Sequence, residues 1–124
     1  MPPARSRRPP RRRWAVAAGA ALVVQLLVLY APHAPSAAAA LPGADKLVHL
    51  AVFAAVTFTA LRAGLCPALV AGFGVVHGVV SEMVQHALLP GRSGDPLDVV
   101  ADVLGVLAGV ALARVLDDQR RATT

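Results

Sequence analysis

The sequence predicts an all-α protein, a four-span antiparallel bundle of transmembrane helices that follows a disordered basic N-terminal arm. Composition is the first reason. Hydrophobic residues make up 56% of the 124 residues and charged residues only 15%, whereas about 25% charged is ordinary for a soluble domain. The second reason is the presence of four runs almost free of charge, because a helix needs about 20 apolar residues to cross a bilayer core.

The four predicted spans cover residues 14–31, 45–62, 66–88 and 97–115. The second and fourth runs reach spanning length only if their polar ends, Asp45-Lys46 and Asp98 to Asp102, belong to the helices. Connectors rich in proline and glycine separate the spans. Short connectors between hydrophobic helices predict antiparallel neighbours.

The termini are polar and mostly basic. Residues 1–13 contain six arginines and four prolines, which predicts disorder, and residues 117–124 form a predicted solvated tail. Four spans place both termini on one side, together with ten of the twelve Lys and Arg residues. The positive-inside rule therefore predicts cytoplasmic termini in the cell (plasma) membrane. A signal peptide cleaved near Ala38–Ala40 is the alternative for the first span, although its 18-residue apolar run exceeds the usual length of about 7 to 15.

Charge and cysteine content exclude several functions. The formal net charge is +5, but six of the twelve cations precede Trp14, and aromatic residues are only 4% of the chain. No basic stripe interleaved with aromatic residues is present, so no nucleic-acid partner is expected. Cys66 is the only cysteine, which excludes an internal disulfide, and its apolar surroundings predict a small buried side chain.

Antiparallel crossings bring polar residues of three spans to one outer end of the bundle. Polar side chains at membrane depth are costly and mark function or tight pairing. They begin the second span, end the third, begin the fourth and occupy the loop between the last two. We therefore predict a binding site formed by Asp45, Lys46, His49, Glu82, Gln85, Arg92, Asp98 and Asp102.

Each of these residues also has a simpler interpretation. Asp45 suits the start of a helix as a cap, but a cap leaves His49 unexplained. Glu82 needs a partner, either Arg92 or Lys46, in a structural ion pair or a ligand site. Gln85 is explained by a hydrogen bond between helices. Arg92 is either a solvated loop charge or a clamp that holds carboxylates of the third and fourth spans, or an anionic head group.

Two glycine pairs with small-xxx-small spacing, Gly74/Gly78 and Gly105/Gly109, predict close helix packing. The second pair shares a helix face with the two aspartates of the fourth span. This face is therefore expected to point into the bundle. His77 lies between the first two glycines and is expected to form a hydrogen bond to a neighbouring helix.

The same polar end contains candidate metal ligands: His49, Glu82, His86, Asp98 and Asp102. The zinc-protease pattern His-Glu-x-x-His is absent, and a carboxylate-rich set selects no particular metal. Phosphate loops, nucleophile elbows and dinucleotide fingerprints are also absent from the sequence. We therefore predict no metal and no other cofactor.

Four segments in sequence order resemble the motifs of the VanZ-like membrane proteins, and the resemblance covers about residues 45–113. They are Asp45-Lys46-Leu-Val-His49, Ser81-Glu82-Met-Val-Gln85, Pro90-Gly91-Arg92, and Asp98-Val-Val-Ala-Asp102-Val-Leu-Gly105 with Gly109. Members of that family are small integral membrane proteins, named after a protein associated with low-level teicoplanin resistance. The resemblance implies no assigned reaction. Asp102 departs from it, because the family pattern usually has asparagine there.

Three functions are compatible with the sequence. The first is a non-enzymatic binding or modulating protein whose outward polar site recognises a cell-wall precursor head group or an envelope protein, linked by the resemblance to glycopeptide susceptibility. The second is a membrane-embedded hydrolase or transferase that acts on a lipid-linked phosphate, with Glu82 or Asp98 as general base. Neighbouring cations keep carboxylates ionised and favour the binding of anionic oxygen through Lys and Arg over proton abstraction. A proton-coupled carrier is disfavoured, because no acid lies mid-span. The oligomeric state stays open.

Overall fold

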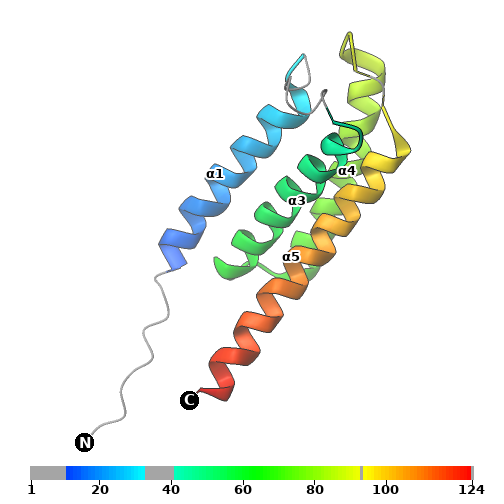
Figure 1. Ribbon diagram of the computed structural model, residues 1–124. Coiled ribbons are helices and arrows are strands. Elements are labelled where there is room, and N and C mark those ends of the chain that lie inside the picture. The colour runs from blue at the N-terminus through cyan, green and yellow to red at the C-terminus, as the bar shows by residue number, and fades with distance from the viewer. Residues whose placement is uncertain (1–10, 33–40, 93, 124) are drawn as a thin grey trace, which may run out of the picture.

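The structure is a computed structural model that describes residues 11–32, 41–92 and 94–123. It contains four helices: α1 (Arg11–Tyr30), α3 (Ala44–Arg62), α4 (Pro67–Leu88) and α5 (Pro96–Ala122). The described residues contain no strand. Successive helices run in opposite directions, so the start of α1 and the end of α5 lie at the same end of the bundle (Figure 1). The predicted all-α four-helix bundle is confirmed.

Two helices extend beyond their predicted bounds. Helix α1 begins at Arg11, so residues 11–13 are helical and do not belong to the predicted disordered arm. Helix α5 continues to Ala122, and the predicted tail is helical and exposed over residues 117–122. Arginine is a good helix former, and neither extension contains glycine or proline. The rest of the predicted arm and the predicted cleavage site near Ala38–Ala40 fall on residues 1–10 and 33–40, outside the described residues.

Local sequence signals fix where the helices begin. Pro67 and Pro96 occupy the first positions of α4 and α5, where a missing N–H costs nothing and the fixed φ suits a helix. Asp95 caps α5, because its side chain accepts a hydrogen bond of 2.9 Å from the backbone N–H of Leu97. Gly91 has φ 82° in the turn between α4 and α5, a conformation that favours glycine.

The surface of the bundle is apolar and much of its interior is polar. All four helices are long and apolar enough to cross a membrane. Large apolar side chains are exposed on each helix, while the most fully buried side chains include Gln25, Ser81 and Asp102. Helices with apolar surfaces all round are typical of membrane spans. The chain is therefore a multi-pass membrane protein. Examples of its exposed residues are Val16, Leu27, Leu47, Leu69, Val76, Leu107 and Leu112.

Helix α3 packs mainly against α5 and α1, and α4 packs mainly against α5. Glycines of α5 allow α3 and α5 to pack closely. A Cβ atom on Gly105 would collide with the backbone oxygen of Leu50, and one on Gly109 would lie 2.7 Å from the backbone oxygen of Ala54. The predicted close packing at this glycine pair is confirmed, and it occurs within one chain.

The other glycine pair faces α5 from α4. A Cβ atom on Gly74 would lie 2.5 Å from a methyl group of Val106, and one on Gly78 would lie 3.0 Å from Asp102. Near this contact, Nε2 of His77 lies 3.2 Å from the hydroxyl of Tyr30 on α1. The expected bond between His77 and a neighbouring helix is thus present.

A separate ion pair lies at the end of the bundle where α1 begins and α5 ends. Arg62 of α3 donates a hydrogen bond of 2.6 Å to Asp117 of α5, and its guanidinium lies 5.5 Å from the ring centre of Trp14 on α1. Cys66 lies at this end, in the turn before α4, and it is exposed. The prediction that Cys66 is buried is wrong, because the residue precedes the helix and stays outside the packed faces.

Candidate functional site

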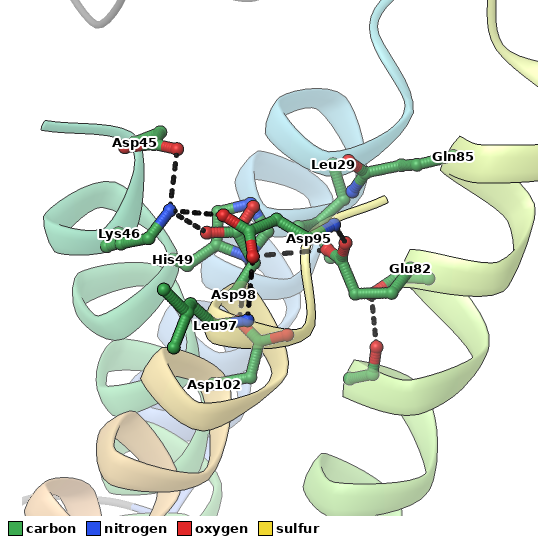
Figure 2. A network of polar contacts seen from close by, with 12 residues as sticks. Leu29, Asp45, Lys46, His49, Glu82, Gln85, Asp95, Leu97, Asp98 and Asp102 are labelled. Carbon is green, nitrogen blue, oxygen red and sulfur yellow. Dashed lines mark hydrogen bonds and ion pairs between the residues drawn. The ribbon is translucent and has the colours of Figure 1, made fainter. Parts of the chain in front are cut away.

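Polar side chains gather where α3 and α5 begin and where α4 ends (Figure 2). His49 lies five residues into α3, Asp102 six residues into α5, and Glu82 six residues before the end of α4. At 1.5 Å per residue, each is about 8 to 9 Å inside its helix end. We name this region the polar cluster. It consists of Asp45, Lys46, His49, Glu82, Asp95, Asp98 and Asp102.

The inner part of the polar cluster joins one residue from each of α3, α4 and α5. Nδ1 of His49 lies 2.9 Å from Oδ1 of Asp102 and 3.9 Å from Oε1 of Glu82. All three side chains are buried, and Asp102 is fully enclosed. Figure 2 shows them pointing toward one another between the helices. A histidine and two carboxylates therefore meet inside an otherwise apolar membrane protein.

Two carboxylate oxygens in this inner part have no hydrogen-bond partner. One oxygen of Glu82, Oε2, accepts a hydrogen bond of 2.9 Å from the backbone N–H of Asp95, and this bond ties α4 to the start of α5. The other, Oε1, is buried and unpartnered, and so is Oδ2 of Asp102. Buried polar atoms are nearly always hydrogen-bonded, because desolvation without a partner is costly. The inner part thus has unused capacity to bind a positively charged group.

The outer part of the polar cluster is organised by Lys46. Its Nζ donates hydrogen bonds to Asp95 at 2.8 Å, Asp98 at 3.1 Å and Asp45 at 3.2 Å. An ammonium group has three donors, so all of them are used. The bond from Lys46, helped by the backbone N–H of Leu97, holds the pKa of the Asp95 carboxyl below its usual value. Lys46 therefore acts as a bridge between α3 and the start of α5.

Arg92 lies beside the polar cluster and donates hydrogen bonds to the end of α1. Its guanidinium donates to the backbone oxygens of Val28 at 3.0 Å and Leu29 at 3.3 Å, and to the side-chain oxygen of Gln85 at 3.4 Å. The last carbonyls of a helix lack partners within the helix, and Arg92 supplies donors for two of them. It has no ion pair with a carboxylate in the described part of the chain. Of the alternatives for Arg92, the clamp of Glu82 and Asp98 is therefore wrong.

The structure brings together most of the predicted site and rearranges the rest. Six of the eight predicted residues belong to the polar cluster, whereas Gln85 and Arg92 form a separate contact with α1. Glu82 is partnered by a backbone N–H and not by Arg92 or Lys46. Asp45 does not cap α3, because Gly43 occupies the cap position and no side chain bonds there. His86 is exposed and lies outside the cluster.

Asp95 was missing from the predicted site. It caps α5, bonds to Lys46 and donates its N–H to Glu82. The signal was available, since an aspartate followed by proline before an apolar run is typical of a helix start. Because α3 and α5 begin at the same end, that start had to lie near Lys46.

The described residues contain one group that could share a metal ion, formed by His49, Glu82 and Asp102. Each residue offers one ligand atom, and these atoms all lie within 4.8 Å of one another. Histidine nitrogen and carboxylate oxygen are both common metal ligands. The residues therefore fit a small cation, although the sequence led us to expect none.

Comparisons of the chain with protein-family models, curated proteins and solved structures found no match. The resemblance of residues 45–113 to the VanZ-like proteins therefore stays a prediction. Function has to be inferred from the chemistry of the polar cluster.

Proposed function

We propose that this chain is a non-enzymatic binding or modulating protein of the cell membrane that holds a cationic group in its polar cluster. One observation carries the proposal. Oε1 of Glu82 and Oδ2 of Asp102 are buried acceptors without partners. Within the polar cluster the donors of Lys46 are already engaged by three carboxylates. The unpartnered donors nearby, Nε of Arg92 and Nε2 of Gln85, belong to the separate contact between Arg92 and Gln85. Free acceptors beside engaged donors favour a positively charged ligand.

The charge of the polar cluster supports the same conclusion. Its members include five acidic residues and one lysine, so the acids remain in excess even if His49 is protonated. Such an excess repels anions and attracts cations. The alternative, a hydrolase or transferase of a lipid-linked phosphate, needs Lys46 or Arg92 to hold the phosphate. Lys46 already bonds to three carboxylates and Arg92 to backbone oxygens, so we favour the binding function.

The orientation we propose places the polar cluster on the outer side of the membrane. Ten of the twelve Lys and Arg residues belong with the two termini. Arg62 is the last residue of α3, and Arg114 lies in the second half of α5. Both helices end where α1 begins, opposite the polar cluster (Figure 1). Basic residues are concentrated on cytoplasmic sides, which makes the polar cluster face outward. The resemblance to VanZ-like proteins suggests cell-wall precursors and glycopeptide susceptibility as the physiological setting.

Susceptibility to teicoplanin tests this function. The wild-type chain and two variants would be expressed in a glycopeptide-sensitive bacterial host, at equal membrane levels verified by immunoblot. Glu82→Gln removes a carboxylate of the polar cluster. Asp117→Asn removes one at the other end of the bundle and serves as the control. We expect the wild type and Asp117→Asn to raise the minimum inhibitory concentration and Glu82→Gln to lose the effect. Equal behaviour of the two variants would contradict the proposal.

A further inference from the structure

The size and burial of the site limit which class of cationic ligand can bind there. His49, Glu82 and Asp102 come from three different helices, and each has at most 6% of its surface exposed. An amine on a lipid or peptide would have to separate the helices to reach them. A single metal ion needs only the space between the ligand atoms. Resting on the function proposed above, we propose that His49, Glu82 and Asp102 bind one divalent transition-metal ion of the zinc or manganese class.

The distances fit a shared ion. Zinc lies about 2.0 to 2.2 Å from histidine nitrogen and carboxylate oxygen, so two ligands of one zinc ion are separated by about 3 to 3.5 Å. Nδ1 of His49 is 2.9 Å from Oδ1 of Asp102 and 3.9 Å from Oε1 of Glu82. These two separations bracket the required value. Small rotations of the three side chains are therefore enough to surround an ion.

The unpartnered oxygens supply the second, independent reason. Oε1 of Glu82 and Oδ2 of Asp102 are buried without a hydrogen-bond donor. A metal ion bound by the three residues gives Oε1 of Glu82 a partner, whereas a proton placed between His49 and Asp102 leaves both oxygens without one. Gly78 lets Asp102 pack closely against α4, because a Cβ atom there would lie 3.0 Å from Oδ2.

The ligand types indicate which ions fit. Imidazole favours transition metals, whereas magnesium and calcium prefer oxygen ligands alone. Three protein ligands leave a coordination position for water or a further ligand. Glu82 is held in place through its second oxygen by the N–H of Asp95, as ligating carboxylates commonly are. On binding, any proton on Nδ1 of His49 passes to solvent and the ion takes its place.

Zinc content of the purified protein tests this inference. The full chain, purified in detergent without a polyhistidine tag, would be stripped with a chelator, incubated with zinc chloride and gel-filtered before its zinc is measured by mass spectrometry. We expect about one zinc ion per chain. Asp102→Asn and His49→Gln should weaken zinc binding at least about tenfold. His86→Ala removes an exposed histidine of α4 and should keep full binding.

A spectroscopic measurement keeps the test independent of whether the variants fold. Cobalt(II) added to the stripped wild-type chain should give visible absorption bands of a low-coordinate nitrogen and oxygen site, and zinc should abolish them by displacement. Wild-type protein that binds neither ion would overturn the inference. So would zinc that is lost in His86→Ala or retained in both Asp102→Asn and His49→Gln.

Failure of this inference and failure of the proposed function give different results. If the wild type binds no metal but Glu82→Gln still abolishes the change in teicoplanin susceptibility, the inference fails and the function stands. If zinc binds at the three residues and Glu82→Gln leaves susceptibility unchanged, the metal site stands and the function fails.

Discussion

The two ends of the bundle join the same two helices in different ways. At the end near Cys66, α3 and α5 are joined by the pair of Arg62 and Asp117, and Asp117 is 58% exposed. At the polar end, α3 and α5 are joined by His49 and Asp102, and Asp102 is fully buried. The basic side chain is nearly buried at both ends, so the two pairs differ in the burial of the acid. Burial of the acid adds a desolvation cost at the polar end that the other end avoids.

The difference extends to the pairing of charges. Arg62 has a matched carboxylate and also lies over the ring of Trp14. At the polar end, by contrast, two carboxylates share one histidine. The unpartnered buried atoms there are oxygen acceptors of these carboxylates, whereas those at the other end are nitrogen donors, Nε of Arg62 and Nε1 of Trp14. An unsatisfied buried carboxylate is expensive in a membrane. Such an arrangement is typical of a site that binds a ligand.

The largest expected effect comes from removing one partner at the polar end. His49→Leu leaves Asp102 buried without its partner, and breaking a buried pair in this way costs about 3 to 5 kcal/mol. Asp117→Ala at the other end removes a carboxylate that is 58% exposed, and it should cost less than His49→Leu because water reaches this acid. The measurement is the free energy of unfolding in detergent micelles, followed by circular dichroism. Equal losses for the two variants would remove the distinction between the ends.

A smaller effect is expected where the helix packing supports the polar end. In Gly105→Ala, the new Cβ atom would collide with the backbone oxygen of Leu50 and push α5 away from α3. Overpacking of this kind costs about 1 to 3 kcal/mol. Gly72→Ala is the matched control, because no atom lies within 4 Å of its added Cβ. The same unfolding measurement should show a loss for Gly105→Ala alone; a similar loss in the control would show that the close contact is unimportant.

The sequence predicted the helix packing behind these two effects, but it did not predict which side chains are paired. Uncharged runs indicated the four spans, and alternate crossings indicated that Lys46, Glu82 and Asp98 share one end. The spacing of the glycines indicated which faces pack closely. All of these follow from periodicity and chain direction. They required no knowledge of how the side chains are paired.

The pairing itself could not be predicted from the sequence. Arg92 lies close in sequence to Asp95 and Asp98. Its guanidinium nevertheless bonds to carbonyl oxygens at the end of α1, more than sixty residues earlier. That choice depends on which helix end lies over the loop. The partner of Glu82 is likewise a backbone N–H, whose position depends on the path of the chain before Pro96. Almost every residue has a backbone donor and acceptor, so residue type does not indicate which of them form these bonds.

The smallest expected effect concerns the exposed rim of the polar cluster and depends on pH. The bond from Lys46 lowers the pKa of Asp95 in the folded protein below its usual 3.8. A lowered pKa contributes stability above the unfolded value, and this contribution is lost as the pH falls through the folded value. Wild type should therefore melt above Asp95→Asn at neutral pH, and the difference should vanish only below pH 3.8. A difference that disappears near neutral pH would show that Lys46 does not hold Asp95.

The most direct test of the polar cluster as a cation site is a crystal structure of the zinc-soaked protein with diffraction recorded at the zinc absorption edge. We predict one anomalous peak between Nδ1 of His49, Oε1 of Glu82 and Asp102, about 2.0 to 2.2 Å from each ligand atom. A map without a peak there, in which His49 and Asp102 bond directly and both carboxylates keep an unpartnered oxygen, would contradict the assignment of the polar cluster as a cation site.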